Sequence, residues 1–176
     1  MARVGKKRRV SWVRGFLGVL LVALLLAVVF RAFFLTSFMI DGESMLATLH
    51  HEERVLVNNL VFHLRTPERG EIVVFDDPDG TEPVVKRIVA SPGEIVEMRE
   101  GLVYLNGTPL PEPYLTYRGS DSFEPMKVPT AHVFVLGDNR PVSSDSRHFG
   151  PVSISALWGK VTMVYWPPSQ VRLWEW

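Results

Sequence analysis

The chain has 176 residues, with 19 basic and 19 acidic side chains, five histidines and no cysteine. This length fits one domain. The net charge of zero argues against a nucleic-acid-binding protein, which would carry a basic excess. The absence of cysteine excludes disulfides, zinc–thiolate sites, iron–sulfur clusters and a cysteine nucleophile. The charge is unevenly distributed, because residues 1–14 carry six basic side chains and no acidic one. Such an asymmetry points to membrane contact for the basic end.

An apolar segment follows the basic end. Residues 15–30 contain no polar side chain, Arg31 interrupts the run, and residues 32–40 are mostly apolar again. A helix over residues 15–30 is about 24 Å long, which is short of the roughly 30 Å hydrocarbon core of a bilayer. The span becomes long enough if Trp12 joins it and Arg31 extends its charged end to the interface. We therefore predict a transmembrane anchor at residues 15–35.

Two alternatives exist for this segment, a buried helix of a soluble protein and a cleaved signal peptide. Six positive charges ahead of a long apolar run disfavour the buried helix. No clean small-x-small cleavage site follows within residues 32–40, which disfavours the signal peptide. By the positive-inside rule, residues 1–14 are expected in the cytoplasm and residues 36–176 on the extracytoplasmic side.

Beyond residue 40 the sequence has the pattern of short strands rich in Val, Ile and aromatic residues and bounded by Gly, Pro, Asp or Asn. Strands are predicted at residues 54–58, 71–75, 84–90, 94–98, 102–105, 132–136 and 159–166. Asn106-Gly107 predicts a tight hairpin, and Asp79-Gly80 is a second candidate. Residues 107–131 are rich in Pro, Gly and polar side chains, and we expect a loop there.

A charged pair, Lys86 and Arg87, lies inside the apolar strand predicted at residues 84–90. By strand alternation Lys86 shares a face with Val84 and Ile88, where an ammonium is costly unless it is paired or deprotonated. One interpretation is a lysine at a sheet edge with its ammonium in water. The other is a desolvated lysine whose lowered pKa lets it act as a base.

Two further segments carry polar groups suited to chemistry. Residues 137–150 form a loop dense in Asp, Asn, Ser and Arg, which serves either as a hydrogen-bonded turn network or as a functional loop. Ser44 follows the apolar segment directly and is not part of a G-x-S-x-G nucleophile elbow. A short helix at residues 44–49 with Ser44 as its N-cap is the plain structural interpretation.

Taken in order, these segments resemble the bacterial type I signal peptidases, which are Ser–Lys membrane proteases. The resemblance covers most of residues 12–166 and begins with the apolar span. It continues with the blocks G-E-S-M-L-A-T-L, R-V-L-V-N, K-R-I-V-A-S-P-G-E and G-D-N-R-P-V-S-S-D-S-R-H-F-G. It implies an all-β antiparallel catalytic domain, with a small β subdomain inserted at about residues 94–131, behind one N-terminal transmembrane helix.

The resemblance also implies roles for individual residues and no cofactor or metal. Ser44 matches the nucleophile, Lys86 the general base, and Ser143 the serine that orients the base. The residues that match loop-bracing positions are Asp138, Asn139, Asp145 and Arg147, with Arg87 as a further partner. The positions that match the lining of a pocket for small side chains are Ile40, Met45, Leu49, Val84 and Val85.

Two positions depart from the family pattern. The family often has Pro where this chain has Ala47, and some members have a Ser where this chain has Gly42. The hydroxyl of that Ser contributes to the oxyanion hole, and one such donor is worth roughly 3 kcal/mol in the transition state. With Gly42, the oxyanion hole is expected to depend on the backbone N–H of Ser44 and a further donor.

The resemblance implies a membrane-anchored endopeptidase that removes signal peptides from secretory preproteins after Ala-x-Ala sites. The expected partners are preproteins, membrane lipid and the protein translocon, and the expected location is the bacterial plasma membrane. An aromatic surface that dips into the lipid interface is a further hypothesis. Its residues would be Phe33, Phe34, Phe38, Trp158, Trp166, Trp174 and Trp176.

Other functions compete with this one. The chain could be a peptidase dedicated to one exported substrate, or an anchored β domain that binds peptides without catalysis. A self-cleaving repressor of a related fold is a third candidate, which the apolar span disfavours. Within the protease hypothesis, a triad of Ser44, His148 and Asp145 is the rival to a Ser–Lys pair.

Overall fold

The computed structural model describes residues 5–78, 80 and 82–174, which fall into two compact units, one up to Thr36 and one from Ser37 onward. The first unit consists mainly of one long helix, α1 (Gly5–Phe34). Its described apolar side chains from Phe16 to Val28 are exposed. Among the residues described, no helix combines the length and apolarity needed to cross a membrane. The predicted transmembrane anchor is therefore not confirmed and stays a prediction.

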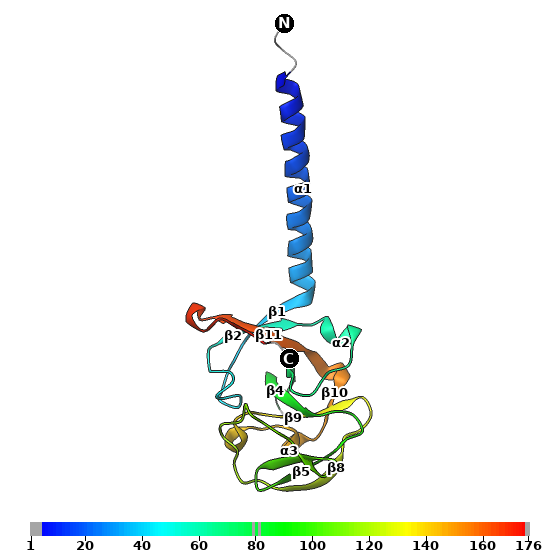
Figure 1. Ribbon diagram of the computed structural model, residues 1–176, viewed down its shortest axis with the longest axis vertical. Helices are drawn as coiled ribbons and strands as arrows, with labels where there is room; N and C mark the ends of the chain where they lie inside the picture. The colour runs from blue at the N-terminus through cyan, green and yellow to red at the C-terminus, as the bar shows by residue number, and fades with distance from the viewer. Residues whose placement is uncertain (1–4, 79, 81, 175–176) are drawn as a thin grey trace. The chain divides into compact units, whose positions relative to one another are not determined.

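The second unit contains two β-sheets and a few short helices (Figure 1). The larger sheet has the strand order β1-β2-β11-β3-β4-β9-β10, and β12 pairs with β11. Its strands are β1 (Leu35–Met39), β2 (Arg54–Asn58), β3 (Ile72–Asp76), β4 (Pro83–Ala90), β9 (His132–Leu136), β10 (Val152–Ser153), β11 (Leu157–Trp166) and β12 (Arg172–Leu173). From β2 onward the neighbouring strands pair in antiparallel fashion.

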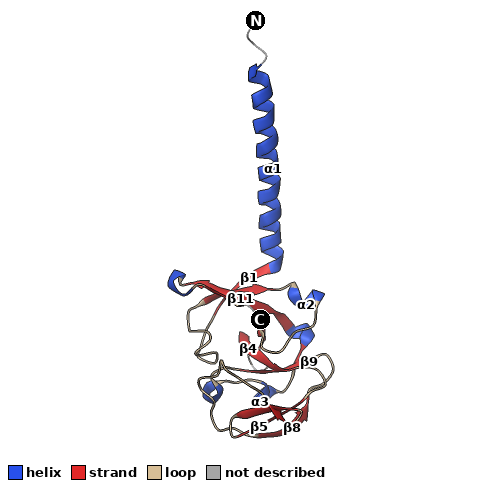
Figure 2. Ribbon diagram, viewed as in Figure 1, coloured by secondary structure: helices blue, strands red, loops and turns tan. Residues whose placement is uncertain are grey.

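The smaller sheet has the strand order β7-β6-β5-β8 and is also antiparallel. Its strands are β5 (Ile95–Arg99), β6 (Leu102–Leu105), β7 (Thr108–Pro109) and β8 (Phe123–Lys127). The sheet lies within the predicted insertion at residues 94–131. In Figure 2 this unit consists mainly of strands and loops, and its helices are short. These short helices are α2 (Val61–Leu64), η1 (Arg140–Val142), α3 (Ser146–Phe149), η2 (Ile154–Ala156) and η3 (Pro168–Gln170).

Strand β4 runs through the middle of the core. Val85 packs into one cluster of buried side chains, Ile88 into a second, and Val89 into a third that also contains the buried apolar residues of β5 and β6. Both faces of β4 are covered, which fits its sequence, because apolar residues occur on both faces of the strand rather than on one. The two charged residues in its centre are therefore placed in an apolar environment.

Most strand predictions agree with the structure, and the Asn106-Gly107 hairpin is confirmed. Both turn residues have positive φ, 51° at Asn106 and 80° at Gly107, between β6 and β7. The second hairpin candidate includes Asp79, which lies outside the described residues. Strand β1 was missed, because its apolar residues continue the apolar run of the predicted anchor.

Two predictions were wrong. Residues 107–131 are not all loop, because β8 pairs with β5 and Phe123 stacks on Phe134 with ring centroids 5.4 Å apart. Residues 44–49 form turns rather than a helix. In a helix the Ser44 carbonyl would accept from the N–H of Thr48, but that N–H donates to Met45 and the carbonyl accepts from Asn139.

Candidate active site

Ser44 and Lys86 meet in the structure although 42 positions separate them in the sequence. Ser44 lies in the turn that follows β1, and Lys86 lies in the centre of β4. The Lys86 Nζ donates a hydrogen bond to Ser44 Oγ at 2.9 Å. Strand β4 has β3 on one side and β9 on the other, so Lys86 is not at a sheet edge. Its side chain is only 3% exposed, which rules out the interpretation as a solvated edge lysine.

The surroundings of Lys86 favour its neutral form. Desolvation by burial lowers the pKa of Lys86, and the positive charge of Arg147 lowers it further. The negative charges of Asp145 and Asp77 act in the opposite direction without cancelling the effect of burial. A lysine with a lowered pKa next to a serine hydroxyl has the properties of a general base.

The loop after β9 is braced by Asp145 and Arg147. Asp145 Oδ1 accepts from Arg147 Nε at 2.8 Å, and Asp145 Oδ2 accepts from the Gly137 N–H at 3.0 Å. Burial alone would raise the pKa of Asp145, but the hydrogen bond and charge of Arg147 outweigh it and lower that pKa. Arg147 Nη2 also donates to the carbonyls of Arg140 and Ser143. The Asp145–Arg147 pair therefore holds the loop together by hydrogen bonds to the loop's own backbone at residues 137, 140 and 143.

Asn139 connects this loop to the turn that carries Ser44. Its backbone N–H donates to the Ser44 carbonyl at 2.9 Å, and its Nδ2 donates to the Glu43 carbonyl at 3.1 Å. A Cβ atom at Gly137 would lie 2.5 Å from the Ser44 carbonyl oxygen and 2.2 Å from Ser143 Oγ. A residue without a side chain is thus required at position 137 for the loop to approach the turn.

Ser143 is buried beside these groups. Its Oγ has no hydrogen-bond partner within the described part of the chain. The nearby Ser143 hydroxyl helps to lower the pKa of Asp145, but the geometry between the two groups is not that of a hydrogen bond. The predicted contact of Ser143 with Lys86 is therefore not formed in this structure, and the role of Ser143 in orienting the base stays a prediction.

Arg87 and Asp138 form a buried ion pair next to the site. Arg87 Nε donates to Asp138 Oδ1 at 2.9 Å and Arg87 Nη2 donates to Asp138 Oδ2 at 2.7 Å. A second buried pair, Arg140 with Glu112, was missed from the sequence. Arg140 lies within the polar block at residues 137–150, but Glu112 lies in the segment expected to be a loop. No local sequence pattern predicts the contact between Arg140 and Glu112.

The histidine triad finds no support in the geometry. His148 is exposed, and the carboxylate of Asp145 is occupied by Arg147 and the Gly137 N–H. Across residues 5–78, 80 and 82–174, no group of three or more His, Asp or Glu side chains is arranged to hold a metal ion.

A cavity of about 160 Å³ opens beside Ser44 and Lys86. The ends of β1 and β4 provide most of its walls. Four of the five predicted pocket residues line it, namely Ile40, Met45, Val84 and Val85. Leu49 does not line the cavity, because it is fully buried in the core beneath it. Asp41 and Glu82 are acidic wall residues that the sequence did not single out.

The proposed aromatic surface is only partly described. Trp158 and Trp166 are 39% and 51% exposed, while Phe38 and Trp174 pack against the core. The side chains of Phe33, Phe34 and Trp176 lie outside the described residues.

Gly42 has a φ of +93°, a conformation that disfavours the Ser found there in some relatives of the resembled family.

The comparisons with known proteins agree with one another. The model of the family "Signal peptidase, peptidase S26" matches residues 10–166. Signal peptidase I of Bacillus amyloliquefaciens is 38% identical over 87% of this chain and 88% of the relative. Signal peptidase I S of Bacillus subtilis is 36% identical over 95% of this chain and 94% of the relative.

Among solved structures, the crystal structure of a signal peptidase I from Enterococcus faecalis superposes with a TM-score of 0.51 and 35% identity. It covers 56% of this chain and 98% of the solved chain. The matched family model includes both segments that place Ser44 beside Lys86 and the loop that braces them. This chain therefore belongs to the peptidase S26 family of signal peptidases.

Proposed function

We propose that this protein is a serine endopeptidase that removes N-terminal signal peptides from exported preproteins, with Ser44 as nucleophile and Lys86 as general base. The observation that carries the proposal is the 2.9 Å hydrogen bond between Lys86 Nζ and Ser44 Oγ, made by a lysine that burial drives toward its neutral form. Membership of the signal peptidase family supports the choice of substrate.

The reaction follows from a neutral Lys86. When its amine has lost its proton, the Ser44 hydroxyl donates to Nζ, and Nζ takes the proton as Oγ attacks the scissile carbonyl carbon. The tetrahedral intermediate places its negative charge on the former carbonyl oxygen, for which the Ser44 N–H is the proposed donor. The Lys86 ammonium then protonates the leaving amine. A water deprotonated by Lys86 hydrolyses the acyl-enzyme ester and regenerates Ser44.

The cavity supports a preference for small side chains near the cut. Its volume of about 160 Å³ is limited, and its walls at Ile40, Val84 and Val85 are apolar. An extended peptide that lies along the ends of β1 and β4 beside the cavity would place alternate side chains toward it. This arrangement suits cleavage after Ala-x-Ala, in which the first and third residues share one side of the strand.

We also propose that residues 15–35 anchor the protein once in the bacterial plasma membrane. The support is the long run without polar side chains behind a basic end, and the exposure of the described apolar residues of α1. By the positive-inside rule the N-terminus is cytoplasmic and the catalytic unit is extracytoplasmic. Lipid is then a partner, and the translocon that delivers preproteins is a second.

The test is cleavage of a preprotein with an Ala-x-Ala site by the full chain in detergent, with the product mapped by mass spectrometry. Ser44→Ala and Lys86→Ala are compared with Ser120→Ala and Lys127→Ala, which make the same changes at exposed positions. We expect one cut after the second Ala, lost only in the first two variants.

Other results would redirect the assignment. A cut that persists in Lys86→Ala would move the base elsewhere, with His148 as the next candidate. No cut in several preproteins across alkaline pH would favour a dedicated substrate or a peptide-binding domain. Because Lys86 must be neutral, the rate is expected to rise with pH through a pKa below the ordinary lysine value. A maximum at acid pH would contradict Lys86 as the base.

A further inference from the structure

The buried Arg87–Asp138 pair connects the strand that carries the proposed base, β4, to the loop that contacts the nucleophile turn. Arg87 follows Lys86 in β4, and Asp138 lies in the loop after β9. Both side chains are almost completely shielded from solvent. Adjacent residues of a strand point to opposite faces, so Lys86 extends toward Ser44 while Arg87 extends toward Asp138. Any displacement of the β4 backbone therefore moves the Lys86 and Arg87 side chains together.

Thr48 joins this pair to the turn that carries Ser44. Its Oγ1 donates to Asp138 Oδ2, and it accepts a longer contact of 3.4 Å from Arg87 Nη2. The Thr48 carbonyl accepts from Arg172 Nη2 at 2.8 Å. Since residues 44–49 do not form a helix, the turn depends on such tertiary hydrogen bonds to hold its position. The Thr48 hydroxyl is the side-chain contact that ties the turn directly to the Arg87–Asp138 pair.

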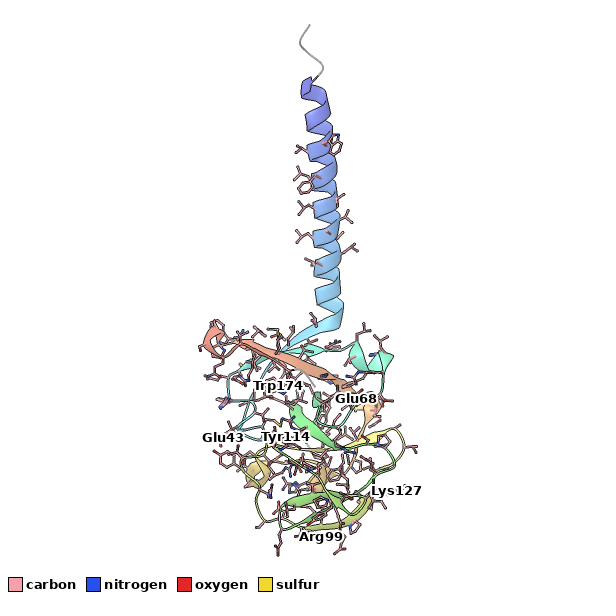
Figure 3. All side chains as sticks on the ribbon, in the orientation of Figure 1. Glu43, Glu68, Arg99, Tyr114, Lys127 and Trp174 are labelled. Carbon is pink, nitrogen blue, oxygen red and sulfur yellow. The ribbon has the colours of Figure 1, made fainter. Side chains whose placement is uncertain are left out.

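Tyr114 covers the Arg87 side chain of this pair. Its ring centroid lies 3.9 Å from Arg87 Cζ, which is a cation–π contact, and its hydroxyl donates to Glu112 Oε1 at 2.8 Å. Glu112 is in turn paired with Arg140, whose Nε donates to the Gly137 carbonyl at 2.9 Å. In Figure 3 the Tyr114 label lies at the level of β4, the strand that carries Arg87. The segment between β7 and β8 thus packs onto the active-site loop.

We propose that Thr48 and Tyr114 are positioning residues that hold the Arg87–Asp138 pair through separate contacts and thereby set the separation of Ser44 Oγ and Lys86 Nζ. The inference rests on the proposed function, because the separation matters only if these two atoms react. Neither residue touches the reacting atoms. A misplacement of about 1 Å can cost roughly 100-fold in rate, so partial loosening is expected to be measurable.

The experiment compares isosteric and rescuing variants in the full chain in detergent. Thr48→Val removes the hydroxyl and keeps the branched shape, whereas Thr48→Ser keeps the hydroxyl. Thr162→Val is the matched control, because Thr162 Oγ1 also makes one part-buried hydrogen bond, to the Leu56 carbonyl at 2.9 Å, between β11 and β2.

Tyr114 is tested in the same way. Tyr114→Leu removes the ring over Arg87, and Tyr114→Phe keeps it. Tyr104→Leu is the matched control, because Tyr104 makes a cation–π contact of 4.8 Å with Arg99 inside the smaller sheet.

Four quantities are measured for each variant: kcat and KM on one Ala-x-Ala preprotein, the thermal unfolding midpoint, and the pKa of Lys86. The pKa is followed by NMR of labelled lysine, with the Lys86 signal assigned by its loss in Lys86→Met. The charged groups whose fields reach Lys86, namely Asp145, Asp77 and Arg147, are unchanged in all variants. A change in the pKa of Lys86 therefore reports its position and burial.

We expect Thr48→Val and Tyr114→Leu each to lower kcat about tenfold, with KM within about twofold. The pKa of Lys86 should rise toward the ordinary lysine value as water reaches the loosened site. Thr48→Ser and Tyr114→Phe should restore most of kcat. The inference is overturned if the pKa of Lys86 stays at the wild-type value, or if the control variants lose as much kcat at equal unfolding midpoints.

The NMR measurement separates the two proposals. If the wild-type chain does not cleave any preprotein, the proposed function fails, but the pKa of Lys86 in the variants still decides whether Thr48 and Tyr114 position it. If the wild type cleaves and the pKa does not move, the positioning inference alone fails.

Discussion

Removing the positive partner of the buried Arg87–Asp138 pair should be among the most destabilising single changes in this protein. In Arg87→Met, the Asp138 carboxylate keeps only the Thr48 hydroxyl as a partner from the described contacts and stays fully buried. Breaking a buried pair in this way costs about 3–5 kcal/mol, because the remaining charge is desolvated without compensation. A single domain is stable by only about 5–15 kcal/mol, so the loss is a large fraction of the total.

The measurement is urea unfolding of the full chain in detergent, followed by tryptophan fluorescence. Arg69→Met is the matched control, because Arg69 pairs with Glu94 at a site where its side chain is 41% exposed. Such an exposed pair contributes about 0–1 kcal/mol. In a thermal scan of a unit of this size, the same Arg87→Met loss corresponds to a fall of roughly 10–20 °C in the unfolding temperature.

The double variant Arg87→Met/Asp138→Leu sharpens the test. Replacing both charges by apolar side chains removes the uncompensated carboxylate, so the double variant should be more stable than Arg87→Met alone. Recovery should be incomplete, because the Gly70 carbonyl loses the hydrogen bond from Arg87 Nη1. The reasoning is refuted if Arg87→Met costs no more than Arg69→Met, or if the double variant is less stable than the single one.

Three further predictions concern acid stability, the nucleophile turn and the cavity. Pairing with Arg147 lowers the pKa of Asp145 in the folded protein. The stabilisation from the ionised Asp145 carboxylate is therefore fully present above its pKa in the unfolded chain, near pH 4, and is lost as pH falls through the lower folded pKa. Asp145→Asn should remove this acid dependence from the urea midpoint. Asn139→Ala removes the hydrogen bond to the Glu43 carbonyl and should lower the free energy of unfolding by about 1 kcal/mol, with kcat falling more than KM changes; an unaltered kcat would show that this bond does not hold the nucleophile. Val84→Phe fills the cavity and should raise KM for an Ala-x-Ala preprotein without changing the pH profile, whereas a lowered KM would mean that substrate does not enter there.

Much of the strand layout could be predicted because strand formation here follows local patterns. Residues 54–58, 102–105 and 132–136 were predicted with the bounds that the structure shows. Short runs of β-branched and aromatic residues between turn formers need little tertiary information. The same holds for the hairpin at Asn106-Gly107, where the turn itself requires residues that accept positive φ. Strand β8 was missed because its residues are mostly exposed and include Pro125, which weakens the pattern.

The sequence alone determined which residue types were available for the site, through the ordered blocks around Ser44 and Lys86 and the polar loop. It could not decide whether Lys86 lies at a sheet edge, because burial of β4 depends on β3 and β9, which come from distant parts of the chain. Nor could it show that residues 44–49 avoid a helix, since the hydrogen bond that occupies the Ser44 carbonyl comes from the distant Asn139 N–H. Side chains that are far apart in the sequence are brought together by packing of the whole domain, and the local sequence around each one does not predict that contact.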